Sequence, residues 1–414
     1  MPEIRLEHIT KRWGKFYGVD NLNLVIENNA FVTLLGPSGC GKTTTLRMIA
    51  GLETPTSGRI TIGDTVVFDS ELGINIPANK RKVGFLFQNY ALWPNMTVYQ
   101  NISFGLSNIK EEMPKISFEA KNAARLAQIL KNPQDVVKTL EECRDKNGKL
   151  DEKKAIIKLI DTYTISQYTA KKLFGYHLEQ GKDVSAEVKA LEEKVEAARK
   201  AQPFNENFEL LKDGKVETAV RKLTKEEIDL SVRRVSRIVK ISMFMDRYPA
   251  ELSGGQQQRV AIARTLAPEP SVLFMDEPLS NLDAKLRLEM RYELQRLHVE
   301  TGSTFVYVTH DQMEAMTLAT RICLINNGVL QQYDPPLTVY GAPENLFVAD
   351  FVGNPAINFI HAHGEQEADG SIRMQLLNGA QARFTANDAL NLSAWFRARD
   401  EEAASEAAAR AARG

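Results

Sequence analysis

The sequence predicts an α/β fold built around a parallel β-sheet with both faces covered. Two observations support this prediction. Short apolar runs of strand type recur along the chain, and helical stretches such as 284–300 separate them. Apolar strands that alternate with helices are typical of a parallel sheet that is buried on both faces. A third observation is that a helical block of more than a hundred residues interrupts this alternation.

The predicted strands form two groups, one before and one after the helical block. They are the runs 31–35, 59–62 and 83–87 in the first group, and 271–275, 304–308 and 321–325 in the second. Each run is short and apolar, as expected of a strand in the interior of a sheet.

The helical block extends from about residue 108 to 223 and is rich in Glu, Lys, Ala and Gln. The pair Asn132-Pro133 predicts a helix start, and Thr224 with Glu227 predicts a capping box at the next helix. We therefore expect a set of helices with one break around Pro203. Apolar residues recur in the block at helical spacing, as at Val188, Leu191, Val195 and Ala198.

After about residue 356 the chain returns to β-type sequence. Asp369-Gly370 and Asn378-Gly379 predict two hairpin turns, which flank a strand around Met374. About three strands are too few for independent stability unless they pack on the core or on a partner. The Ala-, Glu- and Arg-rich end beyond Asp400 is predicted to be a solvated helix or frayed chain.

Composition narrows the possible classes of protein. Of the 414 residues, 43% are hydrophobic and 25% are charged, as in ordinary globular proteins. The formal net charge of −1 gives no general attraction to nucleic acid. The N-terminus lacks a signal-peptide pattern and no apolar run reaches about 18 residues, so we expect no membrane-spanning segment. The three cysteines have neither disulfide nor zinc spacing, which favours a reducing compartment.

A glycine-rich loop follows the strand-type run 31–35 and precedes a helical run. It reads Gly36-Pro37-Ser38-Gly39-Cys40-Gly41-Lys42-Thr43-Thr44 and fits the phosphate-loop pattern. Its glycines let backbone N–H groups converge on phosphates, Lys42 can reach the outer phosphates, and the Thr43 hydroxyl can bind Mg²⁺. A glycine-rich turn could match by chance, but the strand–loop–helix context favours a nucleotide site.

Two adjacent carboxylates are the natural partners of this loop. Asp276 and Glu277 end the apolar run 272–275, at the edge of a parallel sheet where ligands bind. Asp276 is expected to bind Mg²⁺, and Glu277 to polarise the attacking water. An acidic pair after a strand is common, so this prediction depends on the phosphate loop.

The run Leu252-Ser253-Gly254-Gly255-Gln256 separates this chain from the kinases, GTPases and helicases that share a phosphate loop. With this run, the chain resembles the ABC ATPases over nearly everything except the helical block and the tail. Ser253 and two glycines precede a predicted helix at 256–266, so free N–H groups and a helix dipole face an anion. In the family this second anion site acts in trans and closes on the γ-phosphate held by the partner's phosphate loop.

The resemblance assigns further roles residue by residue. Gln88 looks like the residue that senses Mg²⁺ and the attacking water, and His310 looks like the histidine that contacts the γ-phosphate. Asp283 ends a loop, 280–283, that looks like the loop that communicates across the ATPase dimer in the family. Trp13 resembles the aromatic residue that stacks on adenine; Tyr17 is a second candidate, and packing on the first hairpin is the structural alternative. The Mg²⁺ ligands implied are Thr43, Gln88 and Asp276, and the catalytic residues implied are Glu277, His310, Lys42 and Gln88.

The resemblance also implies a domain organisation. Residues 1–345 are expected to form a RecA-like P-loop ATPase core with an antiparallel β-subdomain and a helical subdomain enlarged by the block 108–223. Residues 346–414 would be a reduced OB-like regulatory segment, much shorter than in the family, so we do not expect inherited regulation. The block itself is either a solvated insertion, which is the simpler interpretation, or a docking surface for a regulator or permease.

The implied function is that of an ATP-binding and ATP-hydrolysing importer subunit for a carbohydrate or related solute, with ATP and Mg²⁺ as cofactors. The stretches 89–94, 279–287, 309–316 and 354–359 look like those of maltose- and glycerol-phosphate-type sugar importers. The implied partners are a second ATPase subunit, two membrane permeases and, indirectly, an extracellular solute-binding protein, with no nucleic acid. The implied location is peripheral, at the cytoplasmic face of the membrane.

Two other functions are compatible with an ABC-type sequence. One is a soluble ABC ATPase of repair or translation, and the other is a nucleotide-gated docking module whose hydrolysis is incidental. The chain holds one cassette with sugar-importer stretches, which disfavours the first alternative. Every catalytic position is filled by the expected residue, which disfavours the second.

Overall fold

The computed structural model describes residues 2–145, 148–353, 357–367, 369, 371–376 and 379–385, together with 394, 397–399, 401 and 404. The chain divides into two compact units, Met1–Ala349 and Asp350–Gly414. Among the described residues, no helix is both long enough and apolar enough to cross a membrane.

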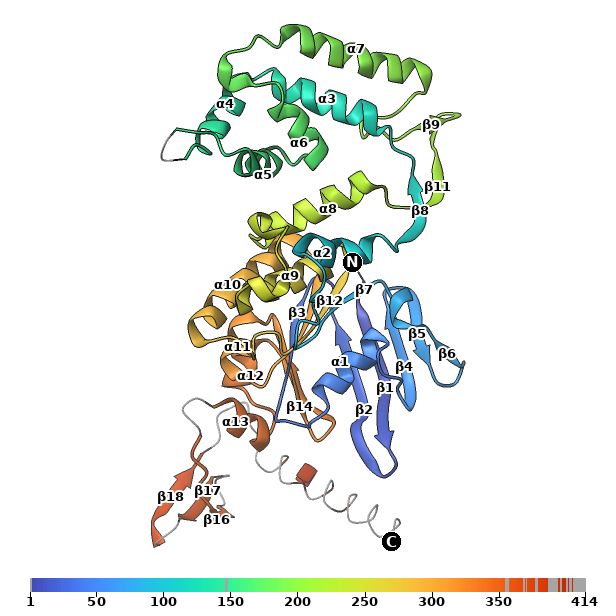
Figure 1. Cartoon of the computed structure of the whole chain (residues 1–414). Coiled ribbons are helices and arrows are strands. Elements are labelled where there is room, and N and C mark those ends of the chain that lie inside the picture. The colour runs from blue at the N-terminus through green and yellow to red at the C-terminus, as the bar shows by residue number, and fades with distance from the viewer. Residues whose placement is uncertain are drawn as a thin grey trace. The chain divides into compact units, whose positions relative to one another are not determined.

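A six-stranded sheet in the order β15-β14-β3-β13-β12-β7 forms the centre of the first unit (Figure 1). Five of its strands are parallel, and the edge strand β15 runs antiparallel to β14. Five of the six predicted strands lie in this sheet, each within one residue of its expected bounds. The observed bounds are β3 Phe31–Leu35, β7 Val83–Leu86, β12 Val272–Asp276, β13 Thr304–Val308, β14 Arg321–Asn326 and β15 Val329–Asp334.

The two faces of the sheet contact different partners. Successive side chains of a strand point to opposite faces, so each strand supplies both cores. Phe31, Leu273 and Phe305 pack with helices on one face, whereas Val32 and Phe274 pack on the other face with α1 (Lys42–Ala50) and a second sheet. The helices of the first face include α2 Val98–Leu106, α8 Lys225–Ile238, α9 Gly254–Leu266, α10 Ala284–Thr301 and α11 Gln312–Leu318.

The second sheet is antiparallel, in the order β2-β1-β4-β5-β6. Its bounds are β1 Ile4–Trp13, β2 Phe16–Ile26, β4 Ser57–Ile62, β5 Thr65–Asp69 and β6 Ile74–Asn75. The buried Arg81 connects this sheet to the end of α1, because it donates to Met48 O, Ile49 O and Ile76 O at 2.8, 2.9 and 2.7 Å. Burial among these carbonyls lowers the pKa of Arg81 to about 10. The arginine thus satisfies carbonyl groups that the last turn of a helix leaves open.

The block 108–223 begins and ends as a two-stranded ribbon, so the expectation of helices alone was wrong there. β8 Lys110–Pro114 pairs antiparallel with β11 Thr218–Lys222. Both strands are mainly polar and exposed, and so lack the apolar alternation that would have predicted them. Between them lie α3 Phe118–Leu130, α4 Pro133–Glu141, α5 Glu152–Tyr163, α6 Gln167–Phe174, α7 Ser185–Ala201, β9 Leu211–Lys212 and β10 Lys215–Val216.

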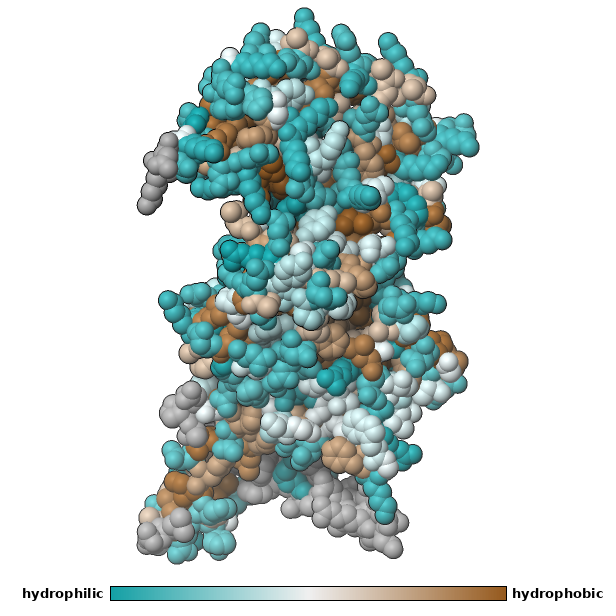
Figure 2. Space-filling model, viewed as in Figure 1, coloured by the Kyte–Doolittle hydropathy of each residue, from teal (hydrophilic) through white to brown (hydrophobic). Residues whose placement is uncertain are grey.

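The local signals inside and after the block were predicted correctly. Asn132 is the N-cap of α4, with Pro133 as the first helical residue. The longest helix of the block, α7, ends at Ala201, just before Pro203. Thr224 and Glu227 form the expected capping box at α8. Figure 2 shows a mostly hydrophilic outer surface over the helices of the block.

These helices enclose a core of their own, separate from the two cores of the sheet; it includes Leu126, Leu130, Leu159, Leu173 and Leu191. The block also contacts α8 through polar groups. Gln167 N donates to Asp229 Oδ2 at 2.6 Å, and Arg237 Nη1 donates to Asp161 O at 2.8 Å. Burial raises the pKa of Asp161, whose carboxylate accepts from Ser242 Oγ at 3.1 Å.

The helix α12 Pro336–Gly341 follows the central sheet, and α13 Leu346–Val352 extends across the division between the units. The second unit contains a three-stranded antiparallel sheet of β16 Ala362–Gln366, β17 Ile372–Leu376 and β18 Gln381–Phe384. Met374 lies in the middle strand, as predicted. Gly370 and Asn378 of the predicted turns, most of the chain beyond Asp400 and residues 354–356 lie outside the described residues.

Candidate active site

The glycine-rich loop between β3 and α1 packs too tightly for side chains at two positions. Gly36 and Gly41 have φ angles of 153° and 102°. A Cβ atom would lie 2.1 Å from Ile325 O at the first position and 2.2 Å from Gly18 O at the second. Only glycine therefore fits at these two positions, and the loop is closely held between the ends of β2 and β14.

Lys42 is buried and turns back over this loop. Its Nζ donates to Gly36 O and Pro37 O, both at 2.8 Å, and lies 3.7 Å from Cys40 Sγ. The ammonium group therefore lies against the backbone of the loop. Burial raises the pKa of the Cys40 thiol, and nearby Lys42 offsets only part of this change, so the thiol is uncharged near neutral pH.

Thr43 and Asp276 meet although they are far apart in sequence. Thr43 Oγ1 donates to Asp276 Oδ1 at 2.7 Å, and Arg47 Nη2 lies 3.6 Å from Asp276 Oδ2. A hydroxyl and a carboxylate side by side suit Mg²⁺, which prefers oxygen ligands and completes its shell with phosphates and water. In the part of the chain that the structure describes, no three His, Cys, Asp or Glu side chains form a metal cluster. Such a cluster is not needed for a magnesium–nucleotide site.

Glu277 lies between Gln88 and His310. Its Oε1 is 3.3 Å from His310 Nδ1, and its Oε2 is 3.5 Å from Gln88 Nε2. Glu277 follows β12, His310 follows β13 and Gln88 follows β7. These three parallel strands are adjacent in the sheet and bring the three residues together at their carboxyl ends. The backbone of Glu277 has a φ of +44°, a region that non-glycine residues rarely adopt and that is concentrated at functional sites.

The loop before α10 contacts the same group. Asn281 Nδ2 donates to the backbone carbonyl of Gln88 at 2.9 Å, and Ser280 Oγ lies 3.4 Å from Gln88 Nε2. Asp283 instead caps α10, accepting from Leu286 N at 2.9 Å. Gln88 is thus held through both its backbone and its side chain.

The sequence patterns did not single out two charged residues beside Glu277. A small cavity of about 50 Å³ is bordered by Glu277, His310, Arg287 and Glu314. Glu314 is buried and accepts hydrogen bonds from the hydroxyls of Tyr307 and Thr309, both at 2.7 Å. Arg287 lies 3.9 Å from Glu314. The one available sequence signal was the position of Glu314 in the first turn of a helix that directly follows a strand end.

The residues 253–256 form the start of α9. Ser253 Oγ accepts from Gln256 N at 3.4 Å, and Gln256 Oε1 accepts from Ser253 N at 3.0 Å, which is a capping box. A Cβ at Gly255 would lie 2.6 Å from the Leu286 side chain, so this glycine lets α9 and α10 approach closely. Ser253 and Gly254 are exposed, so the start of α9 is open to solvent.

Trp13 ends β1 and is about half exposed, as is Tyr17. A Cβ at Gly18 would lie 2.4 Å from the Trp13 ring, so the ring lies on this glycine. The Gly18 carbonyl in turn lies against Gly41 of the phosphate loop. Trp13 is therefore placed beside the loop with part of its ring accessible, and Phe16 lies next to it at a centroid distance of 6.3 Å.

Comparisons with known proteins give a consistent result. Residues 19–280 match the family model described as ABC transporter. The chain is 35% identical over 380 residues to the trehalose/maltose import ATP-binding protein MalK of Thermococcus litoralis, covering 91% of this chain and 72% of that protein. It is 37% identical over 355 residues to the spermidine/putrescine import ATP-binding protein PotA of Aster yellows witches'-broom phytoplasma. This alignment covers 84% of this chain and 73% of that protein.

A solved structure supports the fold independently. It is that of cbiO1 from Clostridium perfringens, part of the ABC transporter complex cbiONQ. It aligns with a TM-score of 0.50 and 20% identity over 82% of this chain and 91% of that one. At this identity the likeness concerns the fold alone.

Proposed function

Because this chain belongs to the ABC transporter family, we propose that it is the ATP-hydrolysing subunit of an importer whose solute is a carbohydrate. The observation that supports this most directly is the meeting of Gln88, Glu277 and His310 at adjacent strand ends beside the phosphate loop. The carbohydrate assignment rests on the stretches 89–94, 279–287 and 309–316 and on the trehalose/maltose relative, which aligns over 91% of the chain.

In the proposed site the nucleotide is held mainly through its phosphates. The backbone amides of the glycine-rich loop and the Lys42 ammonium bind the β- and γ-phosphates. Thr43, Asp276 and Gln88 would hold Mg²⁺, which neutralises charge on the phosphates when it is bound. Trp13 stacks on the adenine through the exposed part of its ring.

Glu277 is the proposed general base. Its carboxylate orients a water molecule in line with the γ-phosphate and accepts a proton as the water oxygen bonds to phosphorus. The bond from the γ-phosphorus to the bridging oxygen breaks, which gives ADP and inorganic phosphate. His310 holds the carboxylate through Oε1 and contacts the γ-phosphate, while Gln88 approaches Oε2.

We propose that a second ATPase subunit completes each site. Ser253, Gly254, Gly255 and Gln256 of that subunit would bind the γ-phosphate with the N-terminal end of α9. Asp283, in the loop that also touches Gln88 through Asn281, would lie at the same interface. The exposure of Ser253 and Gly254 supports this arrangement, and the complete set of residues permits two identical subunits.

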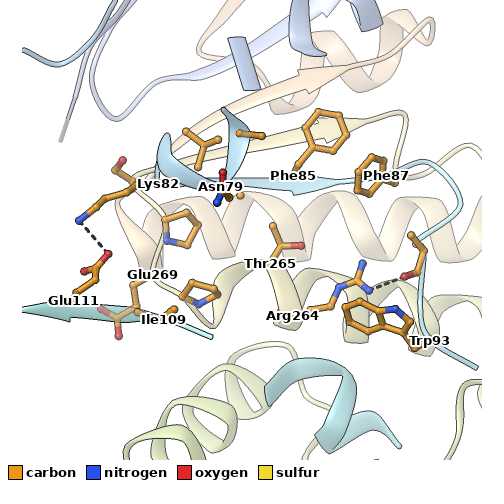
Figure 3. A pocket seen from close by; sticks show the side chains of 17 residues that line it. Asn79, Lys82, Phe85, Phe87, Trp93, Ile109, Glu111, Arg264, Thr265 and Glu269 are labelled. Carbon is orange, nitrogen blue, oxygen red and sulfur yellow. Dashed lines mark hydrogen bonds and ion pairs between the residues drawn. The ribbon is translucent and has the colours of Figure 1, made fainter. Parts of the chain in front are cut away.

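The membrane permeases would bind in a groove of about 780 Å³ between β7 and the end of α9 (Figure 3). Phe85, Phe87, Trp93 and Ile109 make its wall apolar, and a Lys82–Glu111 ion pair of 3.2 Å lies at its border. A short amphipathic helix on the cytoplasmic side of a permease fits such a surface. Phe87 in the wall of the groove directly precedes Gln88 in the sequence.

Membrane extraction tests the proposed function. The tagged chain, purified from detergent-solubilised membranes, should bring down two permease-type proteins, and ATP hydrolysis by the reconstituted complex should rise with transported sugar. The variant Trp93→Glu tests the groove itself. It places a charge in the apolar wall and should reduce permease recovery. Recovery of an active ATPase without any membrane protein would favour a soluble ABC ATPase instead.

We also propose that the block 108–223 is an addition that the ATPase fold does not need. Pro114 pairs with Thr218, so the chain leaves and returns at neighbouring positions. Replacing residues 115–217 with a short Gly/Ser linker should leave the protein soluble. The affinity for ATP should change by no more than about threefold, since closure entropy depends weakly on loop length.

Circular dichroism and a nucleotide-binding titration measure these outcomes. Loss of transport alone in the deletion variant would indicate that the block contacts a regulator or a permease. A deletion variant that is insoluble or does not bind nucleotide would instead show that the block belongs to the ATPase core. The proposed domain division would then be wrong.

A further inference from the structure

The loop that follows Gln88 contains two consecutive residues in the left-handed region. Tyr90 and Ala91 have φ angles of 60° and 47°. This region is unfavourable for residues with a Cβ, and for a bulky residue such as Tyr it marks a constrained backbone. Such a conformation persists only when its surroundings impose it. The loop therefore needs a partner that holds it.

Arg264 is that partner. Its Nη1 donates to Ala91 O at 2.7 Å and its Nη2 donates to Tyr90 O at 2.8 Å, so one planar guanidinium binds both constrained peptides. The flat face of the guanidinium lies over the Trp93 ring, with 5.0 Å between the guanidinium carbon and the ring centroid (Figure 3). Burial lowers the pKa of Arg264.

Arg264 belongs to the last turn of α9, the helix whose first turn is capped by Ser253. Residues 260–263 of this helix are completely buried in the core beneath the central sheet. A close-packed interior of this kind has low compressibility and transmits strain. A displacement at Ser253 is therefore carried to Arg264, and from Arg264 to the loop beside Gln88.

We infer that Arg264 is a positioning residue that couples the helix beginning at Ser253 to the placement of Gln88 against Glu277. Asn281 holds the Gln88 carbonyl from one side, at 2.9 Å, and Arg264 holds the following loop from the other. Contact of Ser253 with the γ-phosphate in trans would then adjust Gln88 in cis. The inference rests on the proposed ATPase function and adds a residue to it.

Removing the guanidinium should affect turnover more than binding. Arg264→Ala should lower kcat by about ten- to a hundredfold, a usual result of misplacing a catalytic group. The KM for ATP should change by less than about threefold, because the phosphate loop is untouched. Arg264→Lys, which can reach one carbonyl but cannot span two, should be intermediate, and the variants should need more Mg²⁺ for half-maximal activity.

Two further variants separate positioning from general stability. Arg259 on the same helix binds Val239 O at 3.2 Å, so Arg259→Ala removes a comparable contact away from the loop and should retain kcat. Ala91→Gly removes the cost of the left-handed conformation at that position. Added to Arg264→Ala, it should restore kcat at least threefold, which a variant that merely failed to fold would not allow.

Hydrogen exchange of the amides 88–93, faster in Arg264→Ala than in Arg259→Ala, gives a measurement that does not depend on activity. Wild-type hydrolysis together with an unchanged kcat in Arg264→Ala would overturn the inference and leave the proposed function intact. Equal losses in the two arginine variants, without rescue by Ala91→Gly, would overturn it as well. Absence of hydrolysis by the wild-type chain would contradict the proposed function itself.

Discussion

Replacing Glu277 with Gln should lower ATP turnover by about 10²–10⁴-fold, the usual contribution of a general base, while ATP binding is retained. Gln has the shape of Glu, so the contacts with His310 and Gln88 can persist, but the amide cannot accept the proton of the attacking water. The ATP-bound dimer should accumulate, because hydrolysis no longer opens it. Phosphate release measures turnover, and size-exclusion chromatography with ATP measures dimerisation.

The exposed Glu289 on α10 provides a matched control. Glu289→Gln removes the same charge elsewhere on the surface and should leave turnover unchanged. Near-normal hydrolysis by Glu277→Gln would mean that another carboxylate is the base. Glu314 would then be the first to examine, since it is buried beside the same cavity.

Mixing a Lys42→Ala chain with a Ser253→Arg chain should restore ATP binding at the dimer interface that either homodimer lacks. The heterodimer holds one intact site, with Lys42 from one chain and Ser253 from the other, and one site with both defects. Each homodimer holds two defective sites and should lose at least about 10² in turnover, because electrostatic stabilisation of the transferred group is lost. Purification with two different tags isolates the heterodimer for binding and hydrolysis assays.

Ser253 also caps α9, so its replacement costs about 1 kcal/mol of helix stability apart from any loss of phosphate binding. Ser253→Asn keeps a capping side chain and provides the control for this effect. A heterodimer of folded chains that binds no more ATP than the homodimers would exclude the composite site and place both anion-binding ends in one subunit.

The parts of this fold that local sequence determines were predictable. The phosphate loop depends on glycines at positions where no side chain fits, and the helix starts at Ser253 and Thr224 depend on a cap and a residue three positions later. The five parallel strands of the central sheet have apolar runs that mark them within a residue, whereas the more exposed edge strand β15 was not predicted.

Other features depend on contacts between distant segments. The ribbon of β8 and β11 is mainly polar and exposed, so neither strand has an apolar period of its own. Arg264 is separated by 173 residues from Ala91, and an arginine late in a helix carries no local signal of its acceptor. The same holds for Arg287 beside Glu314. Sequence patterns therefore point to candidate reacting groups more readily than to the groups that hold them.

The ribbon at the base of the block also has a consequence for the order in which the chain folds. β7 and β12 are neighbours in the central sheet, and Val83 pairs with Val272. The whole block lies between these two residues in the sequence. Helices with a core of their own form mainly local contacts and fold quickly, which brings Pro114 beside Thr218. The prior folding of the block then removes roughly half of the chain that must be closed, and lowers the entropic cost by about 0.6 kcal/mol. The folding of the block is thus expected to offset the closure entropy that its own length would add to the pairing of β7 with β12.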